Sequence, residues 1–187
     1  PEGARVRLPL RVRVPGASVI LALLGAAIGY AYGTHEAEAI AETATREATL
    51  AKLVDNQIVL EYTISAGNQD KTREVVAELM ADRGVRGAVL VGSGGDVLAA
   101  STQATVDRPL SEALASFGWD AALVESMLGR TRESQVPEVT LTPARRSQLG
   151  AIAIVDGTGE ALSPGAPAVL FLEYDYGASV AMVKQRT

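Results

Sequence analysis

Few side chains of this chain are suited to covalent or metal-assisted chemistry. The 187 residues include no cysteine and a single histidine, His35. A chain without cysteine has no disulfide, no thiol nucleophile and no thiolate metal site, and one histidine cannot build a histidine-based metal site. His35 also borders a long apolar run, remote in sequence from any serine and carboxylate that would complete a catalytic triad. We therefore expect no metal, no cofactor and no enzymatic activity in this chain.

Two carboxylates near the C-terminus, Glu173 and Asp175, are spaced to point to the same side of a strand. Paired carboxylates perform acid–base catalysis when their surroundings tune their pKa values. The neighbouring sequence offers no partner for such tuning. We expect a solvated strand end at Glu173, followed by a helix cap at Asp175.

A binding function needs a pocket rather than a nucleophile. We expect such a pocket between a sheet and a helical insertion, mostly apolar with a few polar groups. An arginine there would hold the carboxylate of a small organic acid or amino acid through two hydrogen bonds. The competing interpretation is that the arginines are surface charges and that no ligand exists. The candidate ligand-binding residues, at strand ends and in loops, are Ser101, Thr102, Arg108, Arg145, Arg146 and Tyr174.

Charge is distributed unevenly along the chain, whose formal net charge is −5. Residues 1–33 contain four arginines and one glutamate, so residues 34–187 carry −8. Nucleic-acid binding needs basic surface to neutralise phosphates. The acidic main part of the chain therefore argues against a nucleic-acid partner.

Residues 17–33 form the apolar segment around which the remaining chain is organised. The uncharged run extends from residue 14 to residue 34, and a spanning helix needs about 20 residues. Because arginines precede the run, the positive-inside rule predicts a cytoplasmic segment 1–16, a transmembrane helix 17–33 in the inner membrane and a periplasmic domain 34–187. A cleaved signal peptide and a buried core helix are the alternatives. Since the first residue is Pro1, we expect a piece of a longer protein.

Residues 34–66 predict a long stalk helix, because no proline or glycine occurs before Gly67. Small or apolar residues recur every three or four positions, the spacing of one helix face. This face would either pair with a second copy, giving a homodimer, or pack on the chain's own domain. The expected dimer residues are Ala37, Ala41, Ala44, Ala48 and Ala51.

The residues after the stalk predict a mixed α+β domain built on an antiparallel sheet. Asn68 caps a second helix that ends at Gly84, and Gly129 closes one or two helices over residues 110–128. A glycine-rich turn over residues 92–96 joins two strands; it lacks the lysine of a phosphate-binding loop. The expected strands are 86–91, 97–100, 134–141 at an edge, 149–155 and 168–174, with a loop over 156–167 and an exit helix starting in 175–187.

The hairpin RGAVLVGSGGDVLAAS and the closing segment AVLFLEYDYGASVAMV, placed after an anchor and a long helix, resemble a known family. They are similar to the single Cache (PDC or PAS-like) extracytoplasmic sensor domains of bacterial transmembrane signalling proteins. The resemblance implies a PAS-like central sheet and a final helix that re-enters the membrane. No arginine-plus-aromatic amino-acid signature is present.

Two functions follow from these expectations. In the first, residues 34–187 sense a ligand or signal for a diguanylate cyclase or phosphodiesterase, a histidine kinase or a chemoreceptor, and transmit by helix displacement in a dimer. This function predicts a second apolar span after Thr187. In the second, the chain is a single-span envelope structural or assembly protein whose domain binds a periplasmic protein.

Overall fold

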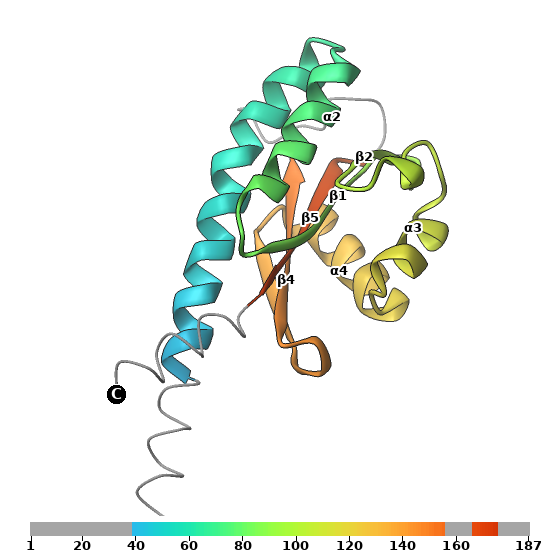
Figure 1. Ribbon diagram of the computed structural model, residues 1–187. Helices are drawn as coiled ribbons and strands as arrows, with labels where there is room; N and C mark the ends of the chain where they lie inside the picture. The colour runs from blue at the N-terminus through green and yellow to red at the C-terminus, as the bar shows by residue number, and fades with distance from the viewer. Residues whose placement is uncertain (1–38, 156–165, 176–187) are drawn as a thin grey trace, which may run out of the picture.

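The computed structural model of the protein describes residues 39–155 and 166–175. Within them, a helix over residues 39–65 precedes three further α-helices and five strands (Figure 1). The helices are α2 (Gln69–Glu78), α3 (Leu110–Phe117) and α4 (Ala121–Ser134), with 3-10 turns η1 (Leu79–Ala81), η2 (Gln103–Thr105) and η3 (Pro143–Arg145). The strands are β1 (Val85–Val91), β2 (Val97–Ala100), β3 (Glu138–Thr142), β4 (Ser147–Ile154) and β5 (Ala168–Asp175).

The strands form one antiparallel sheet in the order β2-β1-β5-β4-β3. The last strand in sequence, β5, lies at the centre and pairs with both β1 and β4. In this register Glu173 of β5 lies between Gly87 of β1 and Leu149 of β4. The predicted mixed α+β fold, an antiparallel sheet flanked by helices, is confirmed.

Helices cover both faces of the sheet, so the domain has three layers (Figure 1). On one face, the helix over residues 39–65 and α2 pack on side chains such as Leu170 and Leu172. On the other face, α3 and α4 pack on Val169 and Phe171 of the same strand. Burial on both faces explains why the centre of β5 is continuously apolar instead of alternating.

A helix is present over residues 39–65, called the long helix below, where the sequence predicted one; its role as a stalk stays a prediction. Its inward face carries Leu53 and Leu60, both fully buried, and threonines whose hydroxyls bond back to the helix, such as Thr49 to the Thr45 carbonyl at 2.8 Å. Two glutamines fix the helix to β4: Gln148 Nε2 donates to the Glu42 carbonyl at 2.9 Å, and Gln57 Nε2 to the Ala153 carbonyl at 3.1 Å. Packing and hydrogen bonds thus set the position of the long helix on the sheet.

Local signals predicted most element boundaries, and four expectations were wrong. The strand predicted over 134–141 begins at Glu138, because α4 continues to Ser134. Asn68 does cap α2, accepting from the Lys71 N–H at 3.0 Å. However, α4 continues past Gly129 to Ser134, and Gln135, with φ 56°, ends it. Gly84 ends no helix; the helical turns stop at Ala81, and Gly84 packs under the Tyr174 ring. The final strand includes Asp175, which the sequence had assigned to a helix.

Several expectations fall outside the described residues: the cytoplasmic segment 1–16, the transmembrane helix 17–33, Ala37, and the exit helix beyond Asp175. Among residues 39–155 and 166–175, no helix combines the length and the apolar character needed to cross a membrane.

Candidate functional site

The most unusual side chain of the domain is the carboxylate of Glu173, near the end of β5. The residue is only 2% exposed and lies on the sheet face covered by α3 and α4. Its Oε2 accepts a hydrogen bond from Trp119 Nε1 at 2.8 Å, and its Oε1 one from Ser147 Oγ at 2.5 Å. The expectation that Glu173 is a solvated strand end was therefore wrong.

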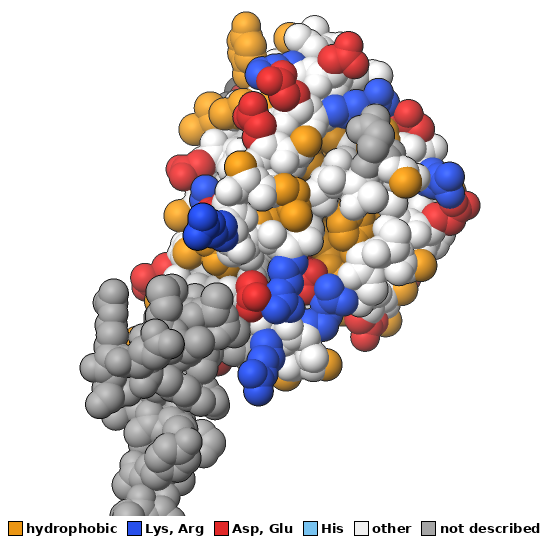
Figure 2. Space-filling view, in the orientation of Figure 1, with side chains coloured by type: hydrophobic (Ala, Val, Ile, Leu, Met, Phe, Trp, Pro, Cys, Tyr) orange, Lys and Arg blue, Asp and Glu red, His pale blue; other side chains and the backbone are white. Residues whose placement is uncertain are grey.

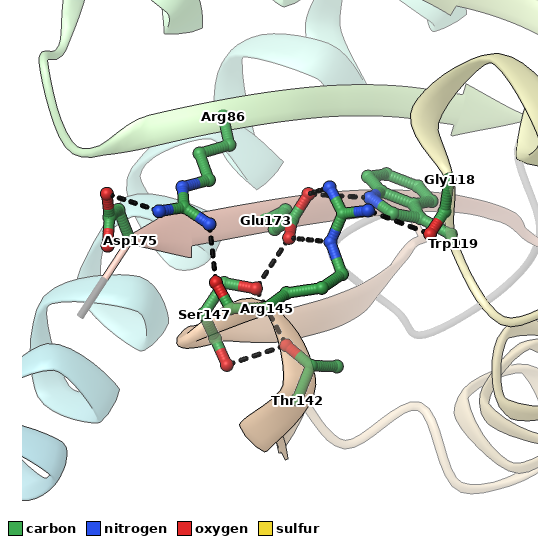
Figure 3. Close-up of polar contacts among 8 residues, drawn as sticks. All are labelled: Arg86, Gly118, Trp119, Thr142, Arg145, Ser147, Glu173 and Asp175. Atoms are coloured by element: carbon green, nitrogen blue, oxygen red, sulfur yellow. Dashed lines mark hydrogen bonds and ion pairs between the residues drawn. The ribbon is translucent and has the colours of Figure 1, made fainter. Parts of the chain in front are cut away.

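Arg145 neutralises this buried carboxylate with a two-pronged contact (Figure 3). Its Nε donates to Glu173 Oε1 at 2.7 Å and its Nη2 to Glu173 Oε2 at 3.0 Å. A third donor, Nη1, binds the carbonyl of Gly118 at 2.8 Å, in the turn between α3 and α4. Arg145 lies in η3, the turn between β3 and β4. Its contacts therefore connect the β3–β4 hairpin with the central strand β5 and with the α3–α4 segment.

A second ion pair extends the network to the end of β5. Arg86 of β1 donates from Nη2 to Asp175 Oδ2 at 2.7 Å and from Nη1 to the backbone carbonyl of Arg145 at 2.6 Å (Figure 3). At the other end, Thr142 Oγ1 donates to the Ser147 carbonyl at 2.6 Å and lies 2.7 Å from the Ser147 hydroxyl. Side chains alternate between the two faces along a strand, so Glu173 and Asp175, two residues apart, lie on one side of β5, as their spacing predicted.

The charge state of Glu173 follows from two opposing effects. Burial by itself raises the pKa of this carboxyl group, because it penalises the charged form. The hydrogen bonds from Arg145, Ser147 and Trp119, together with the positive charge of Arg145, outweigh burial and hold the pKa of Glu173 below its usual value. Glu173 is therefore an anion at neutral pH.

A cavity of about 430 Å³ opens beside this network, between the sheet and α4. Its polar wall consists of Arg145, Glu173 and Thr142, with Asp120 on the helix side. Such a volume falls in the range typical of small-molecule sites, and the location is the predicted one. The apolar lining comes from Trp119, Leu123, Leu141, Pro143, Ala144 and Leu149.

The polar side chains at this site are already engaged with one another. Glu173 accepts four hydrogen bonds from three residues and is no free base, and the Ser147 hydroxyl is one of the donors. Within residues 39–155 and 166–175, no group of three or more histidine, cysteine, aspartate or glutamate side chains is arranged to hold a metal ion. On the face shown in Figure 2, acidic and basic side chains lie together at the lower end, below hydrophobic patches.

Of the six candidate ligand-binding residues, the structure places one, Arg145, at the cavity. The Ser101 hydroxyl accepts from the Ala88 N–H at 3.1 Å, Thr102 precedes η2, and Arg108 pairs with Glu112 at 3.2 Å on the surface. Arg146 is exposed with φ 50°. The Tyr174 hydroxyl points to the opposite side of the sheet, where it donates to Asp82 at 3.2 Å.

The predicted dimer alanines divide between two faces of the long helix. Ala41 is fully buried against the chain's own domain. Ala44 and Ala51 are exposed and Ala48 is half-buried. Packing on the chain's own domain is therefore confirmed for Ala41, and pairing with a second copy stays a prediction.

Sequence reasoning missed Glu173 and Trp119 as members of the polar wall. Trp119 is also a packing residue: it is 7% exposed, and its ring centroid lies 4.9 Å from that of Phe117. The available signal was a glutamate within an apolar strand, because a carboxylate buried in this way requires a cation partner. A comparison of the chain with family models and with curated proteins found no match.

Proposed function

We propose that residues 34–187 form the extracytoplasmic sensing domain of a membrane receptor, of the single Cache or PAS-like type. Its output would be a diguanylate cyclase or phosphodiesterase, a histidine kinase or a chemotaxis domain. The proposal rests chiefly on the cavity beside Glu173. It also rests on the position of Glu173 in the chain. Glu173 stands two residues before Asp175, the last described residue of β5.

The position of the cavity offers a route from binding to movement. The first described turns of the long helix and the end of β5 lie at the same end of the domain (Figure 1). Gln148 joins them, since it pairs with Tyr174 in the sheet and donates to the Glu42 carbonyl of the long helix. A ligand that moved Arg145 would disturb the Arg86 contact to the Arg145 carbonyl and hence the ion pair at Asp175. Signalling domains transmit through small helix displacements of this kind.

A screen of small organic molecules tests the proposal even though the ligand has not been identified. We expect at least one of them to raise the melting temperature of the full chain, because binding to the folded state stabilises it. Ala144→Trp fills the cavity mouth and should abolish the shift. Ala122→Trp, an equally large change on the exposed surface of α4, should preserve it. If no compound acts, or if Ala144→Trp leaves the shifts unchanged, the sensing proposal fails.

The long helix also supports a homodimer. Its outward face exposes large apolar side chains, including Ile58 at 69% and Tyr62 at 74%, in line with the exposed Ala44 and Ala51. Hydrophobic side chains stand out along the edge of the domain over this helix (Figure 2). An apolar stripe of this length is typical of an interaction face. The helix extends about 40 Å at 1.5 Å per residue, long enough to pair with a second copy.

We expect Ala44→Lys/Ile58→Lys to abolish self-association of the full chain, because lysines on both copies would repel across a symmetric interface. Arg46→Glu, an exposed charge change elsewhere on the helix, is the control and should leave association intact. Sedimentation equilibrium measures the result. A native chain that stays monomeric at all concentrations contradicts the dimer.

The same stripe favours the second candidate function, a protein-binding module of an envelope assembly protein. In that case the stripe would receive a periplasmic protein rather than a second copy. Three results together would support this function over sensing. The chain would be monomeric, no compound of the screen would bind it, and a protein cross-linked to the native chain would no longer be cross-linked to Ala44→Lys/Ile58→Lys.

A further inference from the structure

The ligand expected from the sequence was an organic acid or amino acid held by arginine, but the arginine at the cavity already holds an anion. Both carboxylate oxygens of Glu173 occupy the fork formed by Arg145 Nε and Nη2. The neighbouring cation, Arg86, pairs with Asp175 through Nη2 and Oδ2, 2.7 Å apart. The charge of Arg145 in the cavity wall and that of Arg86 behind it are therefore both compensated by carboxylates.

The remaining charge at the cavity is negative. Asp120 lines it from the N-terminus of α4, where its side chain accepts from the Leu123 N–H at 3.2 Å. An anionic ligand would lose its hydration without gaining net attraction, and burying a charge is unfavourable unless it is paired. To obtain the Arg145 fork, the anion would have to displace Glu173, leaving a buried carboxylate without its cation.

The hydrogen-bonding capacity that remains fits an uncharged oxygen. A guanidinium group has five N–H donors, and Arg145 uses three in its bonds to Glu173 and Gly118. The Nη atoms thus retain donors for one carbonyl or hydroxyl oxygen. Around them, the leucines, Pro143, Ala144 and Trp119 present an apolar surface.

We infer that the cavity beside Arg145 takes an uncharged molecule with an apolar ring or chain and one hydrogen-bonding oxygen, and that it discriminates against carboxylates. This inference rests on the proposed sensing function. The Glu173 carboxylate occupies the Arg145 donors that the carboxylate of a ligand would need. The cavity therefore discriminates against carboxylates because this contact is already made within the protein.

Three molecules that share a ring and differ in charge test the inference: benzyl alcohol, benzoate and benzylammonium. We expect titration of the full chain to give benzyl alcohol an affinity at least about tenfold above benzoate, a free-energy difference of about 1.4 kcal/mol. Benzylammonium should also bind less tightly than benzyl alcohol: despite the charge of Asp120, its ammonium group has no acceptor for the Arg145 donors. Ala144→Trp should remove this binding and Ala122→Trp should preserve it. Tighter binding of benzoate or benzylammonium overturns the inference but leaves the cavity as a ligand site. Absence of binding by all three also overturns it, while the wider screen decides separately on sensing.

Glu173→Gln provides the sharper test, because it removes the internal anion while retaining an acceptor for Trp119. The uncovered charge of Arg145 should raise benzoate affinity at least about tenfold and leave benzyl alcohol within a few-fold. Arg145→Gln/Glu173→Gln removes both charges and serves if the single variant does not fold. In this variant benzyl alcohol should still bind better than benzoate. An unchanged benzoate affinity in Glu173→Gln, or preferred benzoate binding in the double variant, contradicts the inference.

Discussion

Arg145→Met is expected to lower the free energy of unfolding by about 3 kcal/mol at neutral pH, the lower end of the range for breaking a buried ion pair. Glu173 is 2% exposed, so the substitution leaves its carboxylate in the interior with only Trp119 and Ser147 as donors. The Arg145 side chain is 35% exposed, and solvent screening of that side of the pair places the effect at the lower end. Urea denaturation of the full chain measures the loss.

Two variants show whether the stranded charge is the cause. Arg86→Met is the matched control: the Arg86 side chain is 38% exposed and its partner Asp175 24% exposed, so we expect a loss of about 1 kcal/mol, typical of surface pairs. Arg145→Met/Glu173→Gln removes the stranded charge and should recover about half of the loss caused by Arg145→Met alone, within the coupling energies of contacting residues. If Arg145→Met is no worse than Arg86→Met, Glu173 does not depend on Arg145.

The pH dependence follows from the pKa of Glu173. In the native chain this pKa lies below its unfolded value, so the group contributes stability above the unfolded pKa, about 4.3, and loses it as pH falls through the folded pKa. Without Arg145, burial dominates and the folded pKa rises. The variant is then penalised increasingly as pH rises above about 4.3. The stability gap between native chain and Arg145→Met should therefore close in acid; a gap that is constant with pH contradicts this explanation.

The architecture was predictable where one local signal decides it. The glycine-rich turn at 92–96 separates two apolar runs, and these runs became β1 and β2. Asn68 accepts from the N–H three residues on, as predicted for a helix cap, and Asp120 does the same at the start of α4. Gly129 misled because an exposed glycine weakens a helix without ending it. Gln135, which ends α4 in a left-handed conformation, carries no signal as strong as glycine.

The candidate site was less predictable because it depends on strand register. Glu173, Arg145 and Trp119 come from β5, η3 and the turn before α4, and only the pairing of β4 with β5 brings them together. The Arg108–Glu112 pair, by contrast, joins residues four apart at the start of α3, with Arg108 just before the cap residue Pro109. In the sequence both arginines lie near strand ends. This position alone could not distinguish Arg145, which contacts a buried carboxylate, from Arg108, which forms a surface pair.

Gly150→Ala is expected to lower the free energy of unfolding by about 2 kcal/mol, within the range for overpacking a close-packed interior. Gly150 lies on β4 beneath the long helix, and a Cβ there would stand 2.7 Å from Leu53 Cδ1 and 2.8 Å from Thr49 Cγ2. Both residues are fully buried on the inward face, so neither side chain can turn into solvent. The added methyl group must push the helix away from the sheet.

Gly129→Ala is the matched control, since nothing lies within 4 Å of a Cβ at this exposed position of α4. There the same change should stabilise the chain by about 0.5–1 kcal/mol through helix propensity. Gly150→Ala/Leu53→Ala should cost less than the sum of the two single variants, because the smaller residue 53 accepts the new methyl group. Additive costs, or a neutral Gly150→Ala, would show that the helix does not rest on this glycine.

The Gly150→Ala variant also tests the proposed signalling path. The long helix is fixed to the sheet at Gly150, at Gln148 through the Glu42 carbonyl, and at Gln57 through the Ala153 carbonyl. Because β4 also pairs with β5 along its length, an outward shift of the helix changes its position relative to Asp175. If sensing proceeds by movement of the long helix relative to β5, Gly150→Ala should alter the ligand-induced change in the distance between two spin labels. The labels are attached to cysteines introduced at the exposed positions Glu47 and Arg83. The chain has no native cysteine, so such labels report only these sites. An identical ligand response in the native chain and the variant would separate helix packing from signal transmission.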